Sequence, residues 1–144
     1  MRRLRQKPFI RHLVSESSMS SKDLIWPVFI VEGRNQRKKI NSMPFICRYS
    51  IDSLIKKLDS LMKYDLKAIA LFPQIEEDLK DEEGTNSYNN NSLICRAIKE
   101  IKGSFPDLGI IADIALDPFT SHGHDGILKE GKIENDETLK VLKK

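Results

Sequence analysis

A chain of 144 residues is long enough for one domain with a hydrophobic core. Its composition, 40% hydrophobic and 31% charged residues, argues against a disordered protein. Its 24 basic and 21 acidic side chains leave a net charge of only +3, which argues against a nucleic-acid binder. The longest apolar run, residues 25–31, is interrupted by Pro27 and is too short to span a membrane.

Residues 1–20 are expected to form a basic N-terminal arm. The segment from Phe9 to Val14 predicts a short helix, but so few apolar side chains cannot build a core of their own. The arm is therefore expected to pack on a partner subunit or to remain disordered. No apolar segment follows the basic start, so the sequence favours a cytoplasmic protein. The isolated residues Cys47 and Cys95 indicate buried thiols rather than a disulfide framework.

Residues 21–144 predict alternating strands and helices. Bulky apolar runs indicate strands at residues 25–31, 67–72 and 108–115. Apolar residues at helical spacing predict helices at 51–62, with Ser50 as N-cap, and at 93–101, ended by Gly103 and Pro106. Charged or polar loops are expected at residues 34–39 and 74–91. A hairpin is expected next, over residues 127–133, with its turn at Glu130-Gly131. A helix is expected from Glu137, with Asn135 or Asp136 as its cap.

This order predicts an α/β fold with a parallel sheet, because strands begin about every 41 to 42 residues and helices lie between them. Both a doubly wound sheet and a (β/α)8 barrel begin this way. A barrel typically needs about 250 residues. The chain is therefore expected to contain about three βα units of a larger, incomplete domain covering residues 21–144.

The segment from Asp113 to Gly126 is the candidate site, because loops that leave the carboxyl ends of strands carry the chemistry of α/β proteins. Asp117 and Asp125, with His122 or His124, could bind a divalent cation. In the alternative hypothesis, the polar residues of this segment only hydrogen-bond the loop backbone; these are Asp113, Asp117, Thr120 and Ser121. The acidic residues 76–83 are interpreted as a solvated face.

Several segments together resemble one family, porphobilinogen synthase, also called 5-aminolevulinate dehydratase. The resemblance runs along essentially the whole chain. Its matching segments are Arg2-Arg-Leu-Arg, Asp23-Leu-Ile-Trp-Pro-Val-Phe-Ile-Val-Glu-Gly33, Ser42-Met-Pro44, Ala70-Leu-Phe-Pro73, Lys80-Asp-Glu-Glu-Gly84, Asp113-Ile-Ala-Leu-Asp-Pro-Phe-Thr-Ser-His-Gly-His-Asp-Gly126 and Asn135-Asp-Glu-Thr138.

The resemblance implies the N-terminal part of a (β/α)8 TIM barrel, preceded by an arm that wraps a neighbouring subunit of a homo-oligomer, commonly an octamer. It implies a lyase that condenses two molecules of 5-aminolevulinate into porphobilinogen, with loss of two waters, in tetrapyrrole and haem biosynthesis. Neither nucleic acid nor a membrane is an expected partner.

The resemblance also bears on the metal. Zinc-dependent relatives place three cysteines at positions matching Ala115, Asp117 and Asp125, and these residues cannot rebuild a thiolate site. Zinc is therefore not expected, whereas magnesium is expected for the full-length enzyme. Asp113, Asp117 and Asp125 are expected to form a wall of the substrate site, with Asp113 near the substrate amine. Asp117 and Asp125 are the first candidate metal ligands, and His122 and His124 are weaker ones.

The family's chemistry uses two lysines that form Schiff bases with the substrates, and these are expected beyond residue 144. Lys129, Lys132 and the terminal pair, Lys143 and Lys144, are interpreted as solvent-facing. No catalytic residue is therefore assigned, and the chain alone is expected to be inactive. Two alternatives remain: a non-enzymatic truncated product that keeps its subunit-association surfaces, and a small stand-alone metal-binding α/β domain.

Overall fold

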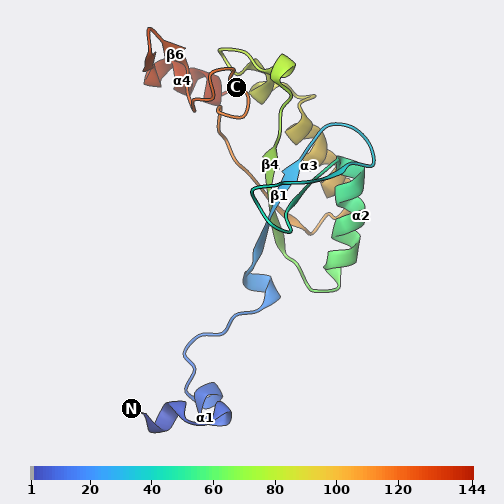
Figure 1. Ribbon diagram of the computed structural model, residues 1–144, viewed down its shortest axis with the longest axis vertical. Helices are drawn as coiled ribbons and strands as arrows, with labels where there is room; N and C mark the ends of the chain where they lie inside the picture. Colours follow the sequence, from blue (N-terminus) through green and yellow to red (C-terminus); the bar gives the residue numbers. More distant parts are fainter. Residues whose placement is uncertain (1) are drawn as a thin grey trace.

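The computed structural model describes residues 2–144, in which an arm extends away from a sheet and its helices (Figure 1). The arm contains the 3-10 turn η1 (Arg3–Arg5) and the helix α1 (Pro8–Leu13), and no residue of either element is buried. The helix expected near Phe9 is thus present. A further turn, η2 (Ser21–Asp23), leads into the sheet.

Four parallel strands and one antiparallel edge strand form the main sheet, in the order β2-β3-β1-β4-β5. The three expected strands are confirmed as β1 (Ile25–Ile30), β4 (Ala68–Pro73) and β5 (Gly109–Ala112). β5 is shorter than expected, because β4 pairs with it only as far as Ala112. The structure adds β2 (Arg37–Lys39) and β3 (Cys47–Tyr49). The prediction of a loop at residues 34–39 is wrong for β2, whose charged residues give no apolar signal.

Helices α2 (Ile51–Met62) and α3 (Leu93–Ser104) confirm the two amphipathic predictions. Their apolar faces meet β1 and β4 in one core, where Leu54, Leu58, Ile69, Leu71 and Ile101 are fully buried. Gly103 lies inside α3 rather than ending it. The helix ends just before Phe105, which fits the restriction that Pro106 imposes on the residue preceding it.

The two crossovers, from β3 through α2 to β4 and from β4 through α3 to β5, progress in the same direction across the sheet. Right-handed connections that progress in one direction place their helices on the same face. Accordingly, α2 and α3 contact each other (Figure 1). This arrangement favours the barrel over the doubly wound alternative, which needs helices on both faces.

The hairpin expected at 127–133 is confirmed as β6 (Leu128–Lys129) and β7 (Lys132–Ile133), with the chain turning at Glu130 and Gly131. Helix α4 (Asn135–Leu142) follows it. The predicted caps are wrong, since Asn135 already lies in the helix and the N-cap residue is Glu134, whose side chain makes no capping bond. The long loop after β4 contains two short 3-10 turns, η3 (Glu77–Leu79) and η4 (Thr85–Tyr88).

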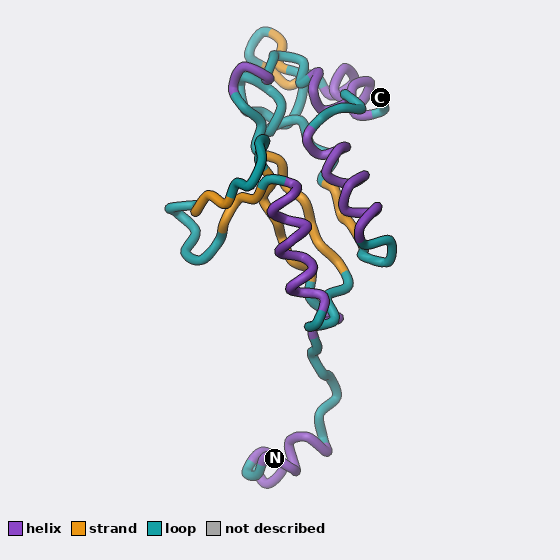
Figure 2. The backbone as a smooth tube through the Cα atoms, turned by 90° about the vertical axis from the view of Figure 1, so that its right-hand side faces the viewer, coloured by secondary structure: helices purple, strands orange, loops and turns teal. Residues whose placement is uncertain are grey.

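The tube view shows α4 and the hairpin at the end of the molecule opposite the arm (Figure 2). None of the helices described between residues 2 and 144 has the length and apolar character needed to cross a bilayer.

Candidate functional site

A cleft of about 270 Å³ lies at the carboxyl ends of β4 and β5. Pro73 ends β4 on one side, and the residues from Ala112 to Leu116 leave β5 on another. Ile94, Cys95 and Ile98 of α3 form a further wall. The cleft therefore occupies the position at which α/β sheets place ligands.

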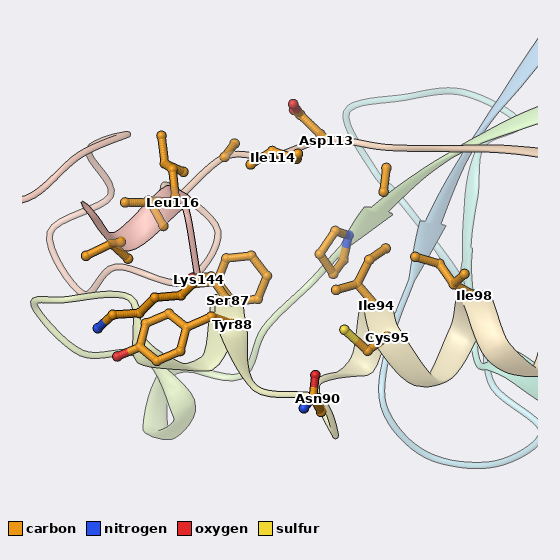
Figure 3. A pocket seen from close by; sticks show the side chains of 16 residues that line it. Ser87, Tyr88, Asn90, Ile94, Cys95, Ile98, Asp113, Ile114, Leu116 and Lys144 are labelled. Carbon is orange, nitrogen blue, oxygen red and sulfur yellow. The ribbon is translucent and has the colours of Figure 1, made fainter. Parts of the chain in front are cut away.

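Asp113 is the one candidate site residue that lines this cleft. Its side chain is exposed, on the segment that leaves β5, and its carboxylate points away from Ile94, Cys95 and Ile98 (Figure 3). The rest of the lining is largely apolar, and Asp113 borders it with a carboxylate that is open to solvent. An exposed carboxylate of this kind can bind a cationic amine.

Asp117 and Asp125 do not line the cleft, although both are exposed. Asp125 holds the loop together, since its Oδ1 accepts a hydrogen bond from the backbone N–H of Leu116 at 2.7 Å. Thr120 has a similar role, because its hydroxyl donates to the carbonyl oxygen of His124 at 2.9 Å. The loop-scaffold hypothesis is therefore right for Thr120 and extends to Asp125.

The two histidines lie side by side, with their ring centroids 5.5 Å apart. His122 Nδ1 accepts from the backbone N–H of His124 at 3.1 Å, and its Nε2 lies 3.2 Å from the carbonyl oxygen of Glu82. The tautomer protonated on Nε2 satisfies both contacts. Within residues 2–144, no three His, Cys, Asp or Glu side chains gather in a way that could hold an ion.

Asp81 joins the loop after β4 to the candidate segment. Its backbone N–H donates to the carbonyl of Phe119, and its carbonyl accepts from Ser121 at 2.9 Å. Partial burial acts to raise the pKa of Asp81, but hydrogen bonds from Thr85 and its neighbours outweigh this and hold the pKa below its ordinary value. Interpreting residues 76–83 as only a solvated face is thus wrong for Asp81, which shapes the site.

Sequence reasoning missed three residues of the cleft. Tyr88 and Lys144 both line it, and Lys144 Nζ lies 4.6 Å from the centroid of the Tyr88 ring. Lys144 is exposed as expected, like Lys129 and Lys132, but it also lines the cleft. Cys95, expected to be a buried thiol like Cys47, is only half-buried and faces the cleft. No sequence pattern indicates these contacts, because they depend on where α4 returns.

Comparison with known proteins identifies close relatives of the whole chain. The family model for delta-aminolevulinic acid dehydratase matches residues 1–144. The delta-aminolevulinic acid dehydratase of Bradyrhizobium diazoefficiens is 46% identical over 141 residues, which cover 98% of this chain and 40% of that protein. The same enzyme from Chlamydia pneumoniae is also 46% identical over 141 residues, and the match covers 42% of it. The chain thus spans less than half the length of these relatives.

A solved structure shows the same fold. The crystal structure of delta-aminolevulinic acid dehydratase (porphobilinogen synthase) from Toxoplasma gondii, in complex with the reaction product porphobilinogen, matches with a TM-score of 0.93 at 40% identity. The match covers 98% of this chain and 40% of the solved chain. The sheet and its helices therefore correspond to part of an α/β barrel, as the strand order indicates.

Proposed function

The chain belongs to the delta-aminolevulinic acid dehydratase family, and on that premise we propose that residues 1–144 form the N-terminal part of a porphobilinogen synthase. The proposed reaction joins two molecules of 5-aminolevulinate into porphobilinogen, with loss of two waters, in tetrapyrrole and haem biosynthesis. The observation that carries this proposal is the close agreement, at a TM-score of 0.93, with an enzyme solved with that product.

In this proposal, Asp113 forms part of one wall of the substrate site. The Asp113 carboxylate would bind the ammonium group of a substrate through a charge-assisted hydrogen bond. The place of Asp113 directly after the carboxyl end of β5 supports this role; the same role for Asp117 and Asp125 remains a prediction.

The Schiff-base lysines of the reaction are proposed to come from residues outside this chain. Lys144 is the lysine that lines the cleft within residues 2–144, and its ammonium group lies over the Tyr88 ring. A cation held on a ring face does not present a neutral amine to a ketone. We therefore expect the 144-residue chain by itself to form no porphobilinogen.

Magnesium is the proposed ion of the full-length enzyme. Asp117 and Asp125 offer carboxylate oxygens, Ala115 offers no side-chain ligand, and none of the three supplies a thiolate. A magnesium ion often keeps several waters while binding one or two carboxylates. Asp117 has the freer carboxylate, because Asp125 already accepts the Leu116 N–H. Calorimetric titration of the full-length enzyme with magnesium, repeated with Asp117→Asn, tests this assignment. Unchanged magnesium affinity in the variant would reject it.

Assembly through the arm is also part of the proposal. The arm exposes Phe9 and Leu13, which are 58% and 80% accessible. A separate groove of about 500 Å³, lined by Trp26, Phe45 and Tyr64 among others, could receive such side chains from a second subunit. The family resemblance leads us to propose a homo-oligomer, and specifically an octamer. The free thiols Cys47 and Cys95 suit a reducing compartment such as the cytoplasm.

A chimeric enzyme tests the proposed function directly. Residues 1–144 would replace the matching N-terminal part of the Bradyrhizobium enzyme, which supplies the remaining strands and the reactive lysines. We expect the chimera to convert 5-aminolevulinate into porphobilinogen, whereas the chain alone does not. Asp113→Ala in the chimera is expected to lower kcat/KM by about tenfold or more, which corresponds to about 1.4 kcal/mol.

Asp107→Ala is the matched control, because Asp107 is an exposed aspartate on the turn before β5, at the opposite end of that strand. It should leave kcat/KM unchanged. A folded chimera without activity would reject the proposal and favour a non-enzymatic association product. Porphobilinogen formation by the chain alone would contradict the assignment of the lysines to other residues.

A further inference from the structure

A ridge of positive charge covers the edge of the sheet beyond β1. It consists of residues on β2, on β3 and in the loop before β2, and is called here the basic ridge: Arg34, Arg37, Lys38, Lys39 and Arg48. Four of these side chains belong to exposed residues, and Arg48 is half-buried. The ridge stands at the side of the sheet away from β5 and the cleft.

The pairing of β2 with β3 places like charges together. Lys38 lies directly opposite Arg48 in the antiparallel register. Like charges that face each other across two strands are destabilising unless an anion lies between them. The arrangement therefore suits a site at which carboxylates arrive from outside.

Nearby carboxylates do not neutralise the ridge. Asp52 accepts hydrogen bonds from the Asn35 N–H and the Ser50 hydroxyl, and Glu32 pairs with Arg96. Among residues 2–144, no ion pair involves any side chain of the ridge. The charge is thus unpaired within one molecule.

Protection of an open sheet edge explains only part of this charge. Lysines on an edge strand prevent pairing with other strands, and that function accounts for Lys38 and Lys39 on β2. It does not account for Arg48, because β3 is already covered by β2 on one side and β1 on the other. Arg34 likewise lies outside the strand.

The chain also carries a complementary surface. Residues 76–83, the acidic segment, contain six carboxylates and one lysine. Glu76, Asp78, Glu82 and Glu83 are exposed, and none of the ion pairs within residues 2–144 involves them. The acidic segment follows the carboxyl end of β4, and the ridge begins after the carboxyl end of the parallel strand β1.

We propose that the basic ridge of one molecule binds the acidic segment of a second copy of this chain. Both surfaces lie toward the same end of the sheet, so a two-fold axis between two molecules can match each ridge with the other molecule's acidic segment. Such a contact is self-complementary, as two-fold interfaces require. Exposed charges make this contact sensitive to salt, because ions screen them within about 8 Å at physiological ionic strength.

Charge exchange between two variants of the full chain tests the proposal. One variant carries Lys38→Glu with Arg48→Glu, and the other carries Glu82→Lys with Glu83→Lys. Each variant alone is expected to self-associate about tenfold more weakly than the wild type, measured by analytical ultracentrifugation. An equimolar mixture of the two should recover association, because opposite charges face each other again at both contacts of the mixed pair.

The mixing experiment distinguishes the contact between ridge and acidic segment from association through any other surface of the molecule. The arm, the groove and the open β5 edge are the same in both variants, so association through those surfaces cannot depend on mixing. Circular dichroism checks that each variant folds, and Lys56→Glu with Lys57→Glu serves as a matched reversal outside the ridge. The proposal is wrong if the mixture associates no better than its components. It is also wrong if the ridge variant loses only the ability to bind a polyanion such as heparin.

Discussion

Arg96 pairs through its Nη2 with Glu32 Oε1, although the two residues are 64 positions apart. The same guanidinium donates from Nε to the carbonyl oxygen of Asn91 at 3.0 Å. Glu32 follows the end of β1, and Arg96 lies in the first turn of α3. One side chain therefore ties the carboxyl end of β1 to the helix that forms a wall of the cleft.

Replacing Arg96 by alanine should lower the free energy of unfolding by about 0.5 to 1 kcal/mol, the range for partly exposed ion pairs. Glu32→Ala with Arg96→Ala should cost less than the sum of the single changes, because each single change already removes the pair. Urea unfolding of the wild type, the two single variants and the double variant measures this coupling. Glu137→Ala, which removes the more local pair with Lys140, is the control. A coupling of zero would show that the Glu32 contact adds nothing.

Replacing Ser50 by alanine should destabilise the fold by about 1 to 3 kcal/mol, because Ser50 is fully buried and its hydroxyl accepts from the half-buried Gln36 N–H at 2.9 Å. The same hydroxyl donates to Asp52 at 2.6 Å. Ser60→Ala is the matched control, because the exposed hydroxyl of Ser60 bonds only the Lys57 carbonyl within its own helix. Thermal or urea unfolding should show a clear loss for Ser50 alone. Equal effects at both positions would contradict the buried contact.

Lowering the pH should weaken the contribution of Asp52 to the free energy of unfolding. The hydrogen bond from Ser50 is the main cause that lowers the pKa of Asp52 from its ordinary 3.8. A carboxyl whose pKa is depressed by folding stabilises the protein above the unfolded value and loses that effect as the pH falls through the folded one. The difference in urea midpoint between wild type and Asp52→Asn should therefore be larger at pH 6 than at pH 3. A difference independent of pH would contradict this.

Replacing Gly126 by alanine should disrupt the hairpin and α4. An added Cβ would lie 2.7 Å from Ile133 Cγ2 and 3.1 Å from Thr138 Oγ1, at a residue whose φ is +156°. Thr138 Oγ1 also accepts the backbone N–H of Ile127 at 2.9 Å, so amide exchange at Ile127 should accelerate. Gly123→Ala is the control, because its added Cβ meets nothing within 4 Å although its φ is +71°. Equal exchange rates in the two variants would show that backbone strain, not the clash, is responsible.

The sequence pattern is sufficient to predict a helix or strand where the element has an apolar face that packs into the core. The periodic residues of α2 and α3 and the apolar runs of β1 and β4 predict elements that the structure confirms almost to the residue. The pattern fails at β2 and β3, because short strands of charged or mixed residues form only through pairing with a distant partner. Asp113 was predictable as a site residue from its place after a strand, whereas Lys144 and Tyr88 were not.

By itself, the sequence determined the alternation of strands and helices, the family and the position of the polar segment after β5, because hydrophobic periodicity and a long motif are local properties. Only the tertiary structure decided which carboxylate borders the cleft and which one holds the loop. It separated Asp113 beside the cleft from Asp125 on the Leu116 N–H, and it brought α4 back beside Tyr88. The contacts of these side chains depend on the path of the folded chain, and the spacing of residues in the sequence does not predict that path.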